Sequence, residues 1–166
     1  LVDTLNLGPD HKVACLAFFT NVEADLWKEA PNYLMRALKF YSDALGAYPY
    51  PQMTAVESIG SAGSGMEYPM ITLIGENFLA EELDAVITHE VGHNWLQGIL
   101  GFNERAHPWM DEGLNTYFEH LYLQQYYGTD PRSPLLPSFF QGDSKYSATE
   151  TIFYYQDRQQ LRQSLN

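Results

Sequence analysis

The stretch HEVGH at residues 89–93 constrains the fold of this chain more than any other feature. It places two histidines four residues apart, with a glutamate directly after the first. On an α-helix, positions four apart lie on the same face, about one turn along the axis. His89 and His93 can present their imidazoles to one metal ion if this stretch is helical, so we predict a helix here.

The glutamate of this stretch suits a catalytic role. Glu90 would lie about 100° around the helix from His89, beside a metal ion rather than on it. A carboxylate in that place can act as a general base toward water. Chance is the alternative, because an HExxH pattern arises by accident on the order of once per hundred chains of this composition. A catalytic zinc site needs a third protein ligand, which therefore decides between the two interpretations.

A third candidate ligand lies in the segment WMDEGLNTYFE at residues 109–119. Eighteen residues separate Glu112 from His93, enough for one helix to end, for a turn to form around residues 98–107 and for a second helix to return. Two histidines and one carboxylate leave the fourth tetrahedral position of zinc open for water. The pattern predicts one Zn²⁺ per chain on His89, His93 and Glu112, although most isolated glutamates are ordinary helical acids.

Two further acids are candidates for the same groove. Glu119 follows Glu112 by seven residues, and seven helical steps return to nearly the same face. Glu67 follows a Gly-rich loop in the stretch GSGMEYP. Spare carboxylates beside a metal suggest a cationic group on the substrate, such as a free α-amine. The simpler alternative pairs Glu119 with His120 or solvent and leaves Glu67 as a loop acid.

Two other residues stand out by their position. Asn94 directly follows the second histidine, and the sequence leaves its role open between tuning the site, capping the helix and facing solvent. Cys15 is the only cysteine and lies in the apolar run VACLAFF, so we expect a small buried residue. Because one cysteine cannot form a disulfide within the chain, the redox compartment stays undetermined.

The rest of the chain favours an α+β fold, with a small sheet followed by the active-site helices. The 166 residues, 45% of them apolar, suit one globular domain. The net charge of −12 argues against a nucleic-acid partner, because phosphate binding needs a basic face. No apolar run is long enough to cross a bilayer.

The expected elements are strands at 13–20, 53–59 and 70–75, helices at 23–46, 77–98 (capped by Asn77) and 108–128, a Gly/Ser loop at 60–65, an irregular segment at 129–147 and a helical end at 154–166.

Taken together, these motifs resemble those of a known family. HEVGH, the eighteen-residue gap and WMDEGLNTYFE are similar to the gluzincin zinc aminopeptidases of the membrane-alanyl aminopeptidase family, which is leukotriene A4 hydrolase-like. That family pairs HExxH with the pattern W-x-x-E-G-x-x-x-Y-x-E, and all of its fixed positions are present at 109–119. It also has a Gly-x-Met-Glu-Asn loop, of which residues 63–69 look like a variant with Tyr68 in place of Asn. The resemblance spans residues 30–125.

The resemblance implies a thermolysin-like catalytic domain in which zinc-activated water attacks the first peptide bond of a peptide. His89, His93 and Glu112 would hold zinc, and Glu90 would be the general base and later the proton donor to the leaving amine. The free α-amine of the substrate would be held by Glu67 and Glu119, which makes the enzyme an exopeptidase for peptides with a free N-terminus. The backbone at Gly65 and Met66 would run beside the peptide like an added strand.

One part of the family pattern is missing from the sequence. The family stabilises the oxyanion with a tyrosine hydroxyl before a Lys-Gly-Ala stretch, and Tyr146, Tyr154 and Tyr155 lack that context. We expect residues 1–166 to be a single catalytic domain within a larger multidomain protein, with the tyrosine beyond it. Two alternatives stay open: a zinc-binding but inactive module, or pseudoenzyme, and an endopeptidase with the same metal site. Compartment, oligomeric state and the preferred N-terminal residue stay undetermined.

Overall fold

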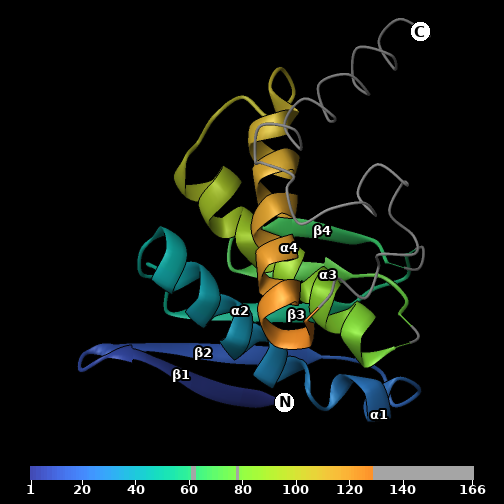
Figure 1. Ribbon diagram of the computed structural model, residues 1–166. Helices are drawn as coiled ribbons and strands as arrows, with labels where there is room; N and C mark the ends of the chain where they lie inside the picture. The colour runs from blue at the N-terminus through green and yellow to red at the C-terminus, as the bar shows by residue number, and fades with distance from the viewer. Residues whose placement is uncertain (61–62, 78, 129–166) are drawn as a thin grey trace, which may run out of the picture. The chain divides into compact units, whose positions relative to one another are not determined.

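The computed structural model of the chain describes residues 1–60, 63–77 and 79–128 (Figure 1). These residues belong to two compact units, one from Leu1 to Trp95 and one that begins at Leu96. The expected irregular segment at 129–147, the expected helical end at 154–166 and the tyrosines within them lie outside the described residues.

The first unit is built on a five-stranded sheet with the strand order β1-β2-β3-β5-β4. The two edge pairs, β1 with β2 and β4 with β5, are antiparallel, whereas β2 with β3 and β3 with β5 are parallel. A mixed sheet together with helices confirms the α+β class. The strands are β1 (Val2–Gly8), β2 (His11–Phe18), β3 (Gln52–Glu57), β4 (Gly65–Tyr68) and β5 (Ile71–Ile74).

Three of these strands were expected from the sequence and two were not. The strand expected at 13–20 is β2, and those expected at 53–59 and 70–75 are β3 and β5. β1 was not predicted, because its residues are mostly exposed and do not alternate between apolar and polar side chains. β4 is only four residues long and follows the Gly/Ser loop directly, so its composition indicated a loop that continues to residue 65.

Helices α2 and α3 pack on one face of this sheet (Figure 1). Successive side chains of a strand point to opposite faces, and the apolar residues of β2 and β3 on the side of the helices are buried. They are Val13, Cys15, Ala17, Met53 and Ala55. This layer forms the core of the first unit, and it supports α3, which carries HEVGH.

The helix expected at 23–46 is split into α1 (Ala24–Trp27) and α2 (Ala30–Leu45). Pro31 explains the break, because proline has no N–H for an intrahelical bond and its ring clashes with the preceding turn. Proline is tolerated at the start of a helix, which is where it stands in α2. α2 ends at Gly46 as expected, with a φ of 108° that favours glycine.

Helix α3 (Ala80–His93) continues as the π-helical segment η1 (Asn94–Ile99), so the helical run to about residue 98 is confirmed. The expected cap at Asn77 is wrong. The helix begins after Leu79, whose N–H donates to the Glu82 side chain at 3.2 Å. The Asn77 side chain instead donates to the carbonyl of Gly75 at 2.8 Å, because it lies too far before the first turn.

The described part of the second unit contains the π-helical segment η2 (Trp109–Gly113) and helix α4 (Leu114–Tyr127). Pro108 stands at the start of η2 and Gly128, with a left-handed φ of 76°, at the end of α4, so the helix expected at 108–128 is confirmed. None of the helices in the described ranges has the length and apolar character that a membrane span requires.

Candidate metal centre

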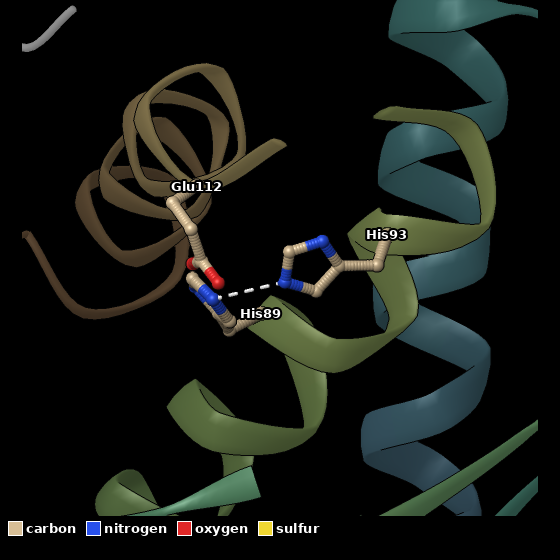
Figure 2. Close-up of side chains that lie close together, drawn as sticks. All are labelled: His89, His93 and Glu112. Atoms are coloured by element: carbon tan, nitrogen blue, oxygen red, sulfur yellow. Dashed lines mark hydrogen bonds between the residues drawn. The ribbon is translucent and has the colours of Figure 1, made fainter. Parts of the chain in front are cut away.

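The two histidines of HEVGH lie together on α3. Their Nε2 atoms face each other at 3.2 Å from successive turns of the helix, as Figure 2 shows. His93 is buried and His89 is half-buried. The helix predicted from the four-residue spacing is present, and it brings the two imidazoles to one place.

This pair fits a zinc ion. Zinc–nitrogen bonds of about 2.0–2.1 Å at a tetrahedral angle place two nitrogens about 3.3–3.4 Å apart. The observed separation of 3.2 Å is close to that value. Imidazole nitrogen is also a ligand that zinc prefers. Both the spacing and the chemistry of this donor pair are compatible with two ligands of one zinc ion.

Glu90 lies on the same helix, against the backbone of β4. Only 5% of its surface is exposed. A Cβ atom built on Gly65 would come within 2.1 Å of the Glu90 Oε1 atom. The absence of a side chain at residue 65 therefore lets the carboxylate rest directly on the strand. The structure places the predicted general base and the predicted substrate strand in contact.

Glu67 lies on the same side of β4 as Gly65. The two residues pair with Thr72 and Ile74 of β5, which are buried beneath the helices. A carboxylate oxygen of Glu67 lies within 4.8 Å of a ring nitrogen of His93. β4 therefore brings the acid predicted from the Gly-rich loop close to the histidine pair.

The strand alternation points the side chains of Met66 and Tyr68 to the opposite face, where both are exposed. Only the backbone of Met66 can therefore contribute on the side of α3. The role expected for the main chain of residue 66 stays a prediction. Tyr68, the departure from the family pattern, points away from the histidines.

The remaining predicted residues belong to the second unit. Glu112, also drawn in Figure 2, lies in η2 and is half-buried. Glu119 lies on α4 and is fully buried. Five-residue π-type turns are rare and are frequent at functional sites, and η2 contains the predicted third ligand. The adjacent acid Asp111 is also buried, at 4% exposure, and the sequence did not single it out.

Asn94, whose role the sequence left open, is buried at 4% exposure and does not face solvent. Its side chain bonds to the main chain of Val91 and Met70. The signal that could have found it is its place directly after the second histidine. Cys15 is buried as expected, and burial raises the pKa of its thiol to about 12, which makes it an inert core residue.

Comparison with known proteins gives a family and a fold. The model of the peptidase family M1 domain matches residues 29–162. Aminopeptidase M1-C of Oryza sativa subsp. japonica is 25% identical over 105 residues, which cover 56% of this chain and 12% of the rice protein. A solved structure of yeast LTA4 hydrolase in complex with bestatin matches 76% of this chain and 20% of the yeast chain, with a TM-score of 0.53 and 21% identity.

The chain therefore spans a small part of both of these proteins. The likeness to the yeast enzyme concerns the fold, whereas the family match extends over most of the sequence and includes both motif segments. It confirms the resemblance that HEVGH and WMDEGLNTYFE indicated. This chain belongs to peptidase family M1.

Proposed function

We propose that this chain is the catalytic part of a zinc-dependent aminopeptidase, which removes N-terminal residues from peptides. The observation that carries the proposal is the facing pair of ring nitrogens on α3, at 3.2 Å. Glu90 of the same helix rests against the backbone of β4. Membership in a peptidase family agrees with this chemistry.

In this proposal His89, His93 and Glu112 hold one zinc ion per chain. Two histidines and one carboxylate form a ligand set that leaves a coordination position open. When bound there, zinc supplies Lewis acidity that polarises a carbonyl group and acidifies water. The two histidines are supported by their geometry, and Glu112 is supported by its spacing from HEVGH and by the family match.

Glu90 performs the proton transfers. Its carboxylate accepts a proton from the water that attacks the first peptide carbonyl, and later delivers a proton to the leaving amine. Burial near the backbone of Gly65 holds the carboxylate where a peptide lying along β4 would pass. A general base has to be within hydrogen-bond reach of the proton that it takes, and this placement supports that role.

The substrate is proposed to bind along β4, which is an edge strand of the sheet. An edge strand offers unpaired main-chain groups, so an extended peptide can add to it at Gly65 and Met66. Glu67, close to His93, and Glu119 hold the free α-amine. A charged amine between two carboxylates forms strong hydrogen bonds, and this requirement makes the enzyme an exopeptidase.

We further propose that residues 1–166 form a single thermolysin-like catalytic domain of a larger protein. The chain matches only 12% of the rice protein and 20% of the yeast chain, so a full-length enzyme of this kind has room for additional domains. The oxyanion-stabilising tyrosine is then supplied from outside the described residues.

Metal content is the first test. Elemental analysis of the purified chain after zinc loading should find about one zinc per chain, and none above background in His93→Ala. His107→Ala is the matched control, because His107 is an exposed histidine outside the motif, and it should keep the zinc. A native chain that binds no zinc would contradict the proposed site.

Activity separates the remaining alternatives. The zinc-loaded chain should hydrolyse L-alanine p-nitroanilide and refuse the N-acetyl form, because the blocked amine cannot be held by carboxylates. Cleavage of blocked peptides would favour the endopeptidase. Zinc binding with no turnover, in the chain and in a longer form of the protein, would favour the inactive module.

A further inference from the structure

The turn between β4 and β5 contains an unusual residue. Tyr68 pairs with Ile71, so Pro69 and Met70 form a two-residue connection between the strands. Met70 has a φ of 65°, and it is the one described residue other than glycine with a positive φ. Proline followed by a positive φ is the pattern of a type II turn, in which glycine or asparagine usually takes the second place. A methionine there needs to be held by its surroundings.

The Asn94 side chain is one of the groups that hold it. The Met70 N–H donates to the Asn94 Oδ1 atom at 3.1 Å. The Asn94 Nδ2 group donates to the carbonyl of Val91 at 3.0 Å. Because the first partner can only donate and the second can only accept, the amide has one possible orientation. On its other side, the Met70 carbonyl accepts from the Thr54 N–H at 3.0 Å.

These bonds connect the end of the histidine-bearing helix to the strand that faces it. Asn94 is the residue after His93, and Met70 is two residues after the end of β4. β4 carries Gly65, on which Glu90 rests, and Glu67, which lies close to His93. The separation between helix and strand decides where a peptide on β4 meets the carboxylate of Glu90.

We propose that Asn94 is a positioning residue, which fixes the β4–β5 turn to the end of α3 and thereby sets the place of the substrate strand. The effect of Asn94 on catalysis rests on the proposed function. Its mechanical part, that Asn94 holds the β4–β5 turn, rests on the described contacts alone. The Tyr48 hydroxyl lies 3.4 Å from the Asn94 Oδ1 atom, but its one proton has a nearer acceptor in the Gln52 carbonyl, at 3.0 Å. The bonds to Met70 and Val91 therefore orient the amide.

Amide hydrogen exchange tests the mechanical part without any activity. In Asn94→Ala, the Met70 amide should exchange at least about tenfold faster, because its acceptor is gone. The matched control is Asn77→Ala, which removes another buried asparagine of the first unit. Among the described residues, the Asn77 side chain donates to the Gly75 carbonyl of its own loop. This control should leave the Met70 amide unchanged. Equal exchange in the native chain and Asn94→Ala would overturn the proposal, whatever the activity of the chain.

Kinetics on L-alanine p-nitroanilide test the catalytic part. Asn94→Ala should raise KM about tenfold, while kcat changes less than about threefold and zinc content stays the same. Adding Met70→Gly should return KM toward the native value, because glycine adopts the positive φ without help. A KM that stays native in Asn94→Ala, or one that Met70→Gly does not restore, would overturn the positioning role. If the native chain lacks turnover, the proposed function fails, and the exchange experiment still decides whether Asn94 holds the turn.

Discussion

Helix α3 carries two buried carboxylates that differ in their surroundings. Asp84 is completely buried and forms an ion pair with Arg36 of α2, so it joins two helices of the core. Glu90, six residues later, is almost as buried, but it rests on the backbone of the edge strand β4 next to the histidine pair. One helix thus contains a carboxylate that pairs with a cation of the core and a carboxylate for which we propose a catalytic role.

The difference shows how burial of charge can serve two purposes. A buried charge costs free energy unless it is paired, and at Asp84 the guanidinium of Arg36 offsets that cost within the protein. A carboxylate used in catalysis must stay near a place that substrate can reach. An edge strand provides that place because its outer main-chain groups are available. Substitutions at the two positions should therefore have opposite consequences for stability and activity.

The largest expected effect is on turnover in Glu90→Gln. The amide keeps the shape of the side chain but cannot take a proton, so kcat should fall by about 10³-fold. Zinc content should stay at one per chain, and the free energy of unfolding should change by less than about 1 kcal/mol. Asp84→Asn is the matched control: it should lose stability and keep most of its turnover. Native turnover in Glu90→Gln would contradict the proposed role of Glu90 as general base, and with it the functional difference between Glu90 and Asp84.

The next effect is on stability, in Arg36→Leu. This substitution removes the cation that pairs with the buried Asp84 carboxylate, so the free energy of unfolding should fall by about 2–3 kcal/mol. The loss is smaller than for a fully buried pair, because Arg36 is partly exposed to solvent. Urea unfolding measures this loss. Lys39→Leu is the control on the same helix, since the Lys39–Asp43 pair is exposed and should contribute no more than about 0.5 kcal/mol. Equal losses of unfolding free energy in the two variants would show that the buried Arg36–Asp84 pair stabilises the fold no more than the exposed pair does.

Cys15 belongs with Asp84 among the groups that serve the fold, and its contribution should appear in alkaline solution. Its thiol ionises near 9.0 in the unfolded chain, and burial raises the pKa to about 12 in the folded one. Above pH 9 the unfolded chain therefore binds fewer protons than the folded chain. The free energy of unfolding should fall by about 1.4 kcal/mol per pH unit from this group as the pH rises from 9 toward 12.

The free energy of unfolding is measured by urea unfolding at about every half pH unit between pH 8 and pH 11. Cys15→Ala should show a shallower decline than the native chain. Burial also raises the pKa of Tyr33 and Tyr48, so some decline remains in the variant. Parallel declines in the two proteins would show that the thiol is not protected by the fold.

The smallest expected effect tests the contact between Glu90 and β4. A methyl group at Gly65 would meet the Glu90 carboxylate at 2.1 Å, so this side chain must turn aside. Because it is flexible, we expect Gly65→Ala to fold normally and to lower kcat/KM about threefold. Gly8→Ala is the control, since a Cβ there meets nothing within 4 Å. An unchanged kcat/KM in Gly65→Ala would mean that the position of Glu90 on the strand does not matter for turnover.

Much of the site could be predicted from the sequence because its signals are local. The spacing of His89 and His93 requires a helix to bring them together, and the helix is present. The break before α2 could have been predicted from Pro31, whose effect depends only on its neighbours. β4 could not have been predicted in this way. It is a four-residue strand after a Gly/Ser loop, and it acquires its structure by pairing with β5.

The sequence by itself determined the family and the helix that carries the histidines, because these depend on residue types at short, fixed spacings. Only the tertiary structure decided that Glu90 rests on Gly65, that Glu67 approaches His93 and that Asn94 holds Met70. Each of these contacts joins β4, or the turn that follows it, to the helical run 24 to 26 residues further along the chain. Such contacts depend on sheet register and helix packing, which no single stretch of sequence contains.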